Sequence, residues 1–349
     1  MIKTLGIAAT AVLLVTGIGN AEQAFAPLKD GNNFVAPFSL AGSQEKIEFV
    51  SNVGLDEENS RVLNGQLADE GEYPYQAALL RVDIEKSTIA QFCGGSMIQD
   101  NWVLTAAHCV VDKRDDGLYL ADASKIGIMV GSTDITKGTD LVGLEQIIVH
   151  KSYDPNSFEN DIALLKLKRK PKAPFKVITL PTAEYADILE QPSVESIVTG
   201  WGRTETGESS VKLVEGKIEL IDRDICNQVL LQPRREAAAE AYAFAVNKLG
   251  VSSDVSNRLW LEMNAAAEEP ISANMICSGT PLGPRGACDG DSGGPLVVRQ
   301  ESGAFIQVGI VSWGMFSSEG PGCNRQAKFS AYTRAGNYAD WILTELGFK

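Results

Sequence analysis

Only two histidines, His108 and His150, occur among the 349 residues of this chain. The chain also has no C-x-x-C pair, no Asn-x-Ser/Thr sequon, no run of Lys and Arg, and no apolar stretch long enough to span a membrane, which takes about 20 residues. These absences argue against a structural zinc site, N-glycosylation, nucleic-acid binding through phosphate neutralisation, and a membrane-spanning helix. A mechanism that needs a proton shuttle near neutral pH therefore has two candidate histidines.

The overall composition is that of an ordinary globular protein. Apolar residues make up 44% of the chain and charged residues 22%, which excludes disorder or a collagen-like fibre for the chain as a whole. The 31 basic and 45 acidic residues give a net charge of −14 at pH 7, which again disfavours nucleic acid as a partner. The length allows one large domain or two modest ones.

Residues 1–21 have the features of a signal peptide. Lys3 precedes a run at 5–19 that only two threonines interrupt, and a small residue follows at Ala21. We expect cleavage after Ala21, with Ala26 as a weaker alternative, and therefore a secreted protein, extracellular or periplasmic. In such a compartment the six cysteines favour disulfide bonds over metal binding.

Residues 22–61 are expected to form a propeptide and residues 62–349 a folded domain. The propeptide lacks cysteine and ends in an acidic, turn-prone stretch at 56–61. From Val62 onward, short apolar strands alternate with glycine-rich turns, which predicts an all-β fold built as an antiparallel sandwich or a pair of barrels. The expected strands are 76–82, 92–98, 102–106, 126–130, 145–150, 162–166, 196–201, 217–220, 295–298 and 307–313.

A helical hairpin is expected to interrupt the β domain at about residues 229–270. Its first helix, 233–249, is rich in Ala and Glu, starts near a proline, and ends before Gly250. Its second helix is expected at 254–269. A further amphipathic helix at 335–346 is predicted to close the domain.

The segment Gly290-Asp291-Ser292-Gly293-Gly294-Pro295 carries the strongest chemical signal. An isolated Asp-Ser-Gly is usually only a turn, but glycines on both sides permit unusual backbone conformations and a close approach of N–H groups. A nucleophile with an oxyanion hole requires an exposed hydroxyl and amides aimed at the developing negative charge. Ser292 is therefore the candidate nucleophile.

His108 is the candidate general base, because it follows an apolar strand in Thr-Ala-Ala-His-Cys. His150 lies where a strand runs into a polar turn, and we expect a structural or surface role for it. Asp161 is the candidate orienting carboxylate, because Asn-Asp-Ile-Ala-Leu-Leu places it at the start of a run with no other charge. Taken alone, such an aspartate would be interpreted as a strand cap.

Four motifs in one order resemble the chymotrypsin/trypsin-type serine endopeptidases. They are Thr-Ala-Ala-His-Cys, Asn-Asp-Ile-Ala-Leu-Leu, Gly-Asp-Ser-Gly-Gly-Pro and Ser-Trp-Gly at 312–314, with the family's order of His, Asp and Ser. The resemblance runs from Val62 to the C-terminus and implies two six-stranded antiparallel β-barrels with the site between them. An esterase of the α/β-hydrolase fold would need the order Ser, Asp, His, and a catalytically silent homologue would usually lack the Ser or the His.

The resemblance implies a serine endopeptidase and a role for each candidate residue. His108 would be the general base, Asp161 would fix its tautomer, and Ser292 would attack the scissile carbonyl. The backbone amides of Gly290 and Ser292 would form the oxyanion hole.

The resemblance also implies a zymogen. Cleavage after Arg61 would free the amine of Val62, which would pair with Asp291 beside the nucleophile and so form the oxyanion loop. The implied disulfides are Cys93–Cys109, Cys226–Cys277 and Cys288–Cys323. These bonds use all six cysteines, and the propeptide has none, so no disulfide would hold the propeptide to the domain after cleavage.

The pocket implied for the residue before the scissile bond has no carboxylate. Gly286 stands six residues before Ser292, where trypsin-like members carry an aspartate, and a buried cation without a partner is strongly disfavoured. We expect medium or large apolar side chains there, as in chymotrypsin- or elastase-like members. The other implied substrate-binding residues are Ala287, Asp289 at the rim, Ser312, Trp313, Gly314, and Ser330 near the floor.

The same pocket should reject Arg61, so the expected partners include a separate trypsin-like activating protease. Protein or peptide substrates and protein inhibitors are the other expected partners. No cofactor is expected and no metal, since the loop at 131–145 lacks clustered acidic ligands. The helical insertion could narrow specificity, form an exosite, or have no function.

Overall fold

The computed structural model describes residues 65–83, 88–138, 140–192, 194–203, 209–267, 269–279, 287–288, 290–315 and 329–348. The expected signal peptide and propeptide lie outside these residues. So do five of the expected site residues, namely Arg61, Val62, Gly286, Asp289 and Cys323.

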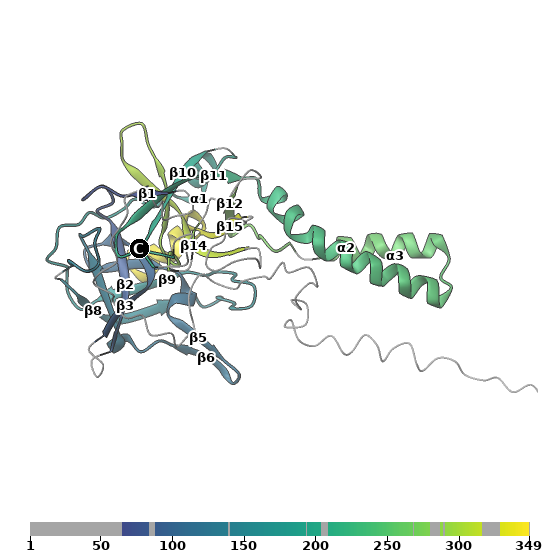
Figure 1. The fold of residues 1–349 in the computed structure, drawn as a ribbon, viewed down its shortest axis with the longest axis horizontal. Helices are drawn as coiled ribbons and strands as arrows, with labels where there is room; N and C mark the ends of the chain where they lie inside the picture. Colours follow the sequence, from purple (N-terminus) through teal and green to yellow (C-terminus); the bar gives the residue numbers. More distant parts are fainter. Residues whose placement is uncertain are drawn as a thin grey trace, which may run out of the picture.

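Six antiparallel strands close into a first barrel in the order β2–β3–β4–β9–β8–β7 (Figure 1). Large apolar side chains that are at most 1% exposed fill its core, among them Leu79, Met97, Leu104, Ile128 and Leu165. Since each strand has one face toward this core, the barrel provides a rigid base for the loops at its rim. The strands are β2 (Gln76–Asp83), β3 (Thr88–Gln99), β4 (Trp102–Thr105), β7 (Ile126–Val130), β8 (Val142–Val149) and β9 (Ala163–Leu167).

A second barrel follows in the order β11–β10–β13–β14–β15–β12, and the pairing of β12 with β11 closes it. The short strand β1 (Gln66–Leu67) pairs with the start of β11, at Val214 and Glu215. The barrel strands are β10 (Glu195–Gly200), β11 (Val214–Ile221), β12 (Met275–Ser278), β13 (Pro295–Arg299), β14 (Phe305–Met315) and β15 (Phe329–Arg334). The expected all-β fold with two six-stranded antiparallel barrels is thus confirmed.

Buried polar side chains join the two barrels. The Gln76 Nε2 group donates to the Thr199 carbonyl at 3.3 Å, and the Thr199 hydroxyl donates to Gln76 Oε1 at 2.8 Å. The Ser96 hydroxyl donates to Gln307 Oε1 at 2.6 Å. Because each of these groups has a partner across the interface, the relative position of the barrels, and of any site between them, is fixed.

Some strands were not expected from the sequence. The hairpin of β5 (Val111–Arg114) and β6 (Gly117–Leu120) is mostly exposed, and five consecutive charged residues at 112–116 occupy β5 and the turn, so no apolar alternation marks it. The four-residue strand β12 and the strand β15 also went unrecognised, although both are needed to close the second barrel. The strands β12 and β15 form because they pair with each other and with strands distant in the sequence, which their local composition does not indicate.

The expected helical hairpin is present as α2 (Arg223–Leu249) and α3 (Ser253–Ala265), and it extends away from the barrels (Figure 1). The prediction that the first helix starts near Pro233 was wrong by ten residues. The side chain of Asp222 accepts a hydrogen bond from the Asp224 amide and caps the helix start. Pro233 therefore lies inside α2, where a proline bends a helix, and the ribbon changes direction along α2 in Figure 1.

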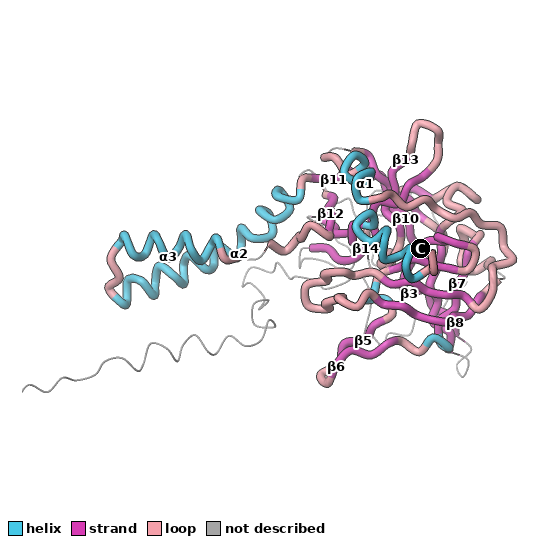
Figure 2. The backbone as a smooth tube through the Cα atoms, turned by 180° about the vertical axis from the view of Figure 1, so that it is seen from behind, coloured by secondary structure: helices cyan, strands magenta, loops and turns pink. Residues whose placement is uncertain are grey.

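The remaining helices are short. The helix α1 (Ala183–Leu189) precedes β10, and a 3₁₀ turn at Ala335–Tyr338 leads into α4 (Ala339–Glu345), which corresponds to the expected closing helix. Figure 2 shows α1 and α4 beside the strands and the hairpin projecting to one side. Within the described residues, no helix is both long and apolar enough to cross a membrane.

Candidate active site

The buried carboxylate of Asp161 lies at the centre of the candidate site. Asp161 is 0% exposed and precedes β9, and His108 is 5% exposed in the 3₁₀ turn η2 (Ala107–Cys109) after β4. Oδ1 accepts the His108 backbone N–H at 2.9 Å, and Oδ2 lies 2.7 Å from His108 Nδ1. The Ser312 hydroxyl of β14 also donates to Oδ2, at 2.5 Å. This carboxylate favours the tautomer with the proton on Nδ1, which leaves Nε2 as the basic nitrogen.

The turn before Asp161 is held in an uncommon backbone conformation. Phe158 and Asn160 have φ values of 57° and 56°, in the left-handed region that residues other than glycine seldom adopt. The Asn160 side chain secures the turn, since it donates to the Ser152 carbonyl at 2.8 Å and accepts from the Tyr338 hydroxyl at 3.0 Å. These contacts fix the point at which Asp161 enters the barrel interface.

The loop of Ser292 packs against the segment that carries His108. The amide of Gly94 donates to the Ser292 carbonyl at 2.7 Å. Gly293 has a φ of 75°, and a Cβ there would lie 2.7 Å from the Gly94 carbonyl oxygen and 3.0 Å from the Ala106 nitrogen. Only glycine therefore permits this approach of the loop to the residues directly before His108.

The Ser292 side chain is fully buried, which differs from the exposed hydroxyl expected from the sequence, and its hydroxyl has no hydrogen-bond partner among the residues that the structure describes. No hydrogen bond between Ser292 Oγ and His108 Nε2 is present, and Nε2 instead lies 3.8 Å from the Cys109 sulfur. Catalytic hydrogen bonds are often long or misaligned before substrate binds. The structure thus joins His108 to Asp161 directly and brings the Ser292 loop beside them.

The carboxylate of Asp291 is buried beside the candidate nucleophile. It accepts the Gly202 amide at 2.8 Å through Oδ1 and the Cys288 amide at 2.9 Å through Oδ2. A Cβ on Gly202 would lie 2.6 Å from the Asp291 carboxyl carbon, so a glycine is required where the chain wraps around this group. The Asp291 side chain is therefore already placed within the second barrel by backbone donors.

Gln91 is a residue of the candidate site that was not expected from the sequence. From β3 its side-chain amide donates to the Gly290 carbonyl at 2.7 Å and to the Cys93 carbonyl at 3.0 Å. The Gly290 carbonyl and the Asp291 N–H belong to one peptide group, and this N–H donates to the Cys288 carbonyl at 2.9 Å. The peptide after Gly290 is thus held at both ends. No local pattern marks Gln91, because its partner is about 200 residues away.

Phe158 is a second residue that was not recognised. Its ring packs edge-on against the His108 ring, with centroids 6.2 Å apart. It also belongs to a buried cluster with Leu230 at the base of α2 and with Trp313 of β14. The base of the helical hairpin is therefore continuous with the wall beside His108.

The described residues of the expected specificity pocket come from β14, from β15 and from the segment at 287–288. Gly314 pairs with Ser330, and the Ser330 hydroxyl accepts the Ala287 amide at 3.2 Å. Burial raises the pKa of Tyr332 above its usual range, so its hydroxyl stays neutral where it bonds Ser278 at 2.8 Å. None of these side chains carries a charge. Gly286 and Asp289, the other expected pocket residues, lie outside the described part of the chain.

Disulfides join Cys93 to Cys109 and Cys226 to Cys277. Cys288 is also disulfide-bonded, and Cys323, its expected partner, lies outside the described residues. Cys93, His108 and Cys109 form a compact group of potential metal ligands. Since the two sulfurs are bonded to each other, they offer no thiolate to a metal.

His150 has a packing role. Its ring lies edge-on to those of Tyr338 and Trp341, with centroids 5.4 and 5.1 Å away. Burial, together with the nearby Lys151 charge, lowers the pKa of His150. The neutral ring accepts the Ser152 amide at 3.3 Å, and this arrangement agrees with the structural role expected from the sequence.

Comparisons with known proteins agree with this architecture. A model of the Trypsin family matches residues 62–342. The chain is 33% identical over 82% of its length to the Suppressor of tumorigenicity 14 protein homolog of Bos taurus and 32% identical over 84% to Vitamin K-dependent protein C of Mus musculus. It is 33% identical over 80% of its length to Trypsin Blo t 3 of Blomia tropicalis. The matched regions span 28%, 53% and 84% of these relatives, respectively. The chain belongs to the trypsin family of serine proteases.

Proposed function

We propose that this protein is a secreted serine endopeptidase that cleaves peptide bonds through an acyl-enzyme on Ser292. The observation that carries the proposal is the buried Asp161 carboxylate, which accepts hydrogen bonds from the backbone and the imidazole of His108 and from Ser312. Such a carboxylate orients the imidazole and stabilises it when it becomes positive.

In the proposed reaction, His108 Nε2 takes the proton from Ser292 Oγ while Oγ bonds to the scissile carbonyl carbon. The carbonyl π electrons move to the oxygen, and the amides of Gly290 and Ser292 stabilise the negative charge that develops on it. Collapse of this intermediate expels the amine, which takes the proton from His108. A water molecule then gives a proton to His108 and attacks the acyl-enzyme, and the second intermediate collapses to release the acid while His108 returns the proton to Ser292 Oγ.

We infer that cleavage after Arg61 activates the enzyme. The new amine of Val62 would reach Asp291, and this pairing would order the loop that carries Gly290 and Ser292. The placement of Asp291 by the Gly202 and Cys288 amides supports this inference, since these backbone donors hold the carboxylate in a buried position beside Ser292.

The proposed specificity is for medium or large apolar side chains before the scissile bond. On a peptide library, the enzyme processed at Arg61 should turn over substrates with Phe, Leu or Met at this position at least about 100-fold better than those with Arg or Lys, because burial of an unpaired cation costs several kcal/mol. A Gly286→Asp variant should gain activity on Arg and Lys substrates. Equal or better cleavage after Arg by the unaltered enzyme would contradict this proposal.

The same specificity implies that the enzyme does not cleave its own Arg61 efficiently. A separate trypsin-like protease is therefore the proposed activator, and protein inhibitors that bind such clefts are further proposed partners. Wild type and Ser292→Ala, each purified alone, should both remain uncut at Arg61. Cleavage in the wild type only would show self-activation.

Gln91 is proposed as a positioning residue for the oxyanion loop. Gln91→Met keeps the length of the side chain but removes the donor to the Gly290 carbonyl, so we expect kcat to fall about tenfold with KM little changed. Gln91→Lys retains an N–H donor at similar length and should recover part of kcat. A purely structural role would lower stability in Gln91→Met without this effect on kcat, and steady-state kinetics with thermal melting separate the two.

A further inference from the structure

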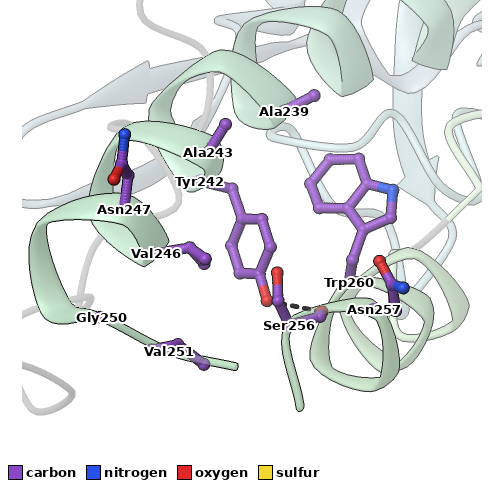
Figure 3. A pocket seen from close by; sticks show the side chains of 10 residues that line it. All are labelled: Ala239, Tyr242, Ala243, Val246, Asn247, Gly250, Val251, Ser256, Asn257 and Trp260. Carbon is purple, nitrogen blue, oxygen red and sulfur yellow. Dashed lines mark hydrogen bonds between the residues drawn. The ribbon is translucent and has the colours of Figure 1, made fainter. Parts of the chain in front are cut away.

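The helical hairpin is held together by one narrow seam. The Tyr242 hydroxyl of α2 donates to the Ser256 carbonyl at 2.7 Å, and the Tyr242 and Trp260 rings pack 5.3 Å apart (Figure 3). A groove of about 590 Å³ remains between the two helices. No residue of α3 is buried. Because helices gain most of their stability from packing an apolar face, this hairpin leaves much of that stabilisation unused.

The outer face of α2 points away from the seam and is formed by Ala237, Glu240, Ala241, Phe244 and Lys248. At 3.6 residues per turn these five positions share one side of the helix, and all of them are exposed. The large Phe244 ring at the centre of this outer face is 66% exposed. The Lys248 ammonium lies 5.6 Å from the centre of this ring, which places both side chains together.

The charges on the outer face are symmetric about Phe244. Glu240 lies four residues before it and Lys248 four residues after it, and neither makes an ion pair within the described residues. If a second α2 helix crosses antiparallel with a two-fold axis at Phe244, each Glu240 faces the Lys248 of the other copy. The symmetry produces this pair twice, and the two Phe244 rings meet on the axis.

The distribution of net charge also favours association of two copies through the helical hairpin. The chain as a whole has a net charge of −14, so most of its surface repels a second copy. The outer part of the hairpin, from Arg234 to Glu262, is neutral. Its basic residues are Arg234, Arg235, Lys248 and Arg258, and its acidic residues are Glu236, Glu240, Asp254 and Glu262.

We propose that the outer face of α2 binds the same face of a second copy, so that the protein forms a two-fold dimer through its helical hairpins. Phe244 lies about 30 Å along α2 from its start, and the hairpin extends away from the barrels (Figures 1 and 2). An antiparallel pairing of the two helices therefore keeps the two protease bodies at opposite ends of the contact. Ala237 and Ala241 permit a close approach of the helix backbones.

The proposal is tested by sedimentation velocity of the full-length chain between about 1 and 200 µM. The contact is smaller than a standard interface, so we expect a dissociation constant on the order of 10 µM. Phe244→Asp should abolish the dimer. Glu240→Lys and Lys248→Glu should each weaken it at least about tenfold, because each places like charges opposite one another twice.

Two combinations make the test specific. The double variant Glu240→Lys/Lys248→Glu should dimerise like the wild type, and an equimolar mixture of the two single variants should form heterodimers, because opposite charges face each other again in both cases. Arg258→Glu, which makes the same charge change on α3, should have no effect, and circular dichroism verifies that each variant keeps its helices. The proposal would be overturned if the wild type stays monomeric at 200 µM, or if it dimerises with an affinity that the substitutions at Phe244, Glu240 and Lys248 do not alter.

Discussion

Asp161→Asn should lower kcat about 10⁴-fold at neutral pH, as expected when the base of such a site is held in the wrong tautomer. The Asp161 Oδ1 atom accepts a hydrogen bond from the His108 backbone N–H at 2.9 Å, and Oδ2 accepts hydrogen bonds from His108 Nδ1 at 2.7 Å and from the Ser312 hydroxyl at 2.5 Å. An asparagine side chain has one oxygen that can accept hydrogen bonds, and its nitrogen can only donate them. With the proton moved from Nδ1 to Nε2, His108 loses the lone pair that would receive the proton of Ser292.

The matched control for this variant is Asp154→Asn, the same chemical change in the turn before Asp161. Among the described residues, the carboxylate of Asp154 accepts hydrogen bonds from Asn156 and Ser157, which lie within its own turn. The Asp154→Asn substitution should change kcat by less than about threefold, since the Asp154 side chain does not contact His108. An Asp161→Asn enzyme within tenfold of the wild type, on an apolar peptide substrate, would refute the role assigned to this carboxylate.

Asp291→Asn should leave an enzyme that is correctly cut at Arg61 but nearly inactive. The variant removes the charge that would pair with the buried Val62 amine, and an unpaired buried charge costs about 3–5 kcal/mol. We therefore expect kcat/KM to fall by about 10²- to 10⁴-fold, mainly because the oxyanion loop is less often formed.

Amino-terminal sequencing must first show that the Asp291→Asn variant starts at Val62, so that failed processing is not mistaken for lost activity. Asn should retain the acceptor for the Gly202 amide, and the variant is therefore expected to fold. Near-normal turnover of the cleaved variant would rule out the activation switch.

Local patterns in the sequence predicted the parts of the site that lie within motifs. His108, Asp161 and Ser292 each lie in a short motif that resembles one of the serine endopeptidases, and the glycines around Ser292 permit the conformation of its loop. Gln91 and Phe158 could not be found in this way. Their contacts with Gly290 and His108 depend on how the barrels meet, and neither residue type is restricted locally.

The difference between local patterns and contacts between distant parts of the chain also explains which elements of the fold could be predicted. Most barrel strands have continuous or alternating apolar residues and were predicted within a few positions. The short strand β12 is formed because β11 and β15 flank it. The start of α2 was misplaced because Pro233 resembles a helix start, whereas buried side chains at Cys226 and Leu230 extend the helix before it.

The central claim is that Ser292 is a nucleophile activated by His108, and covalent labelling tests it most directly. After cleavage at Arg61, a fluorophosphonate should modify the protein at one site, which mass spectrometry of the digested protein would assign to Ser292. The uncut chain and the cut Ser292→Ala and His108→Ala variants should react at least about 100-fold more slowly. A cleaved wild type that does not react, or that reacts at another residue, would contradict the account.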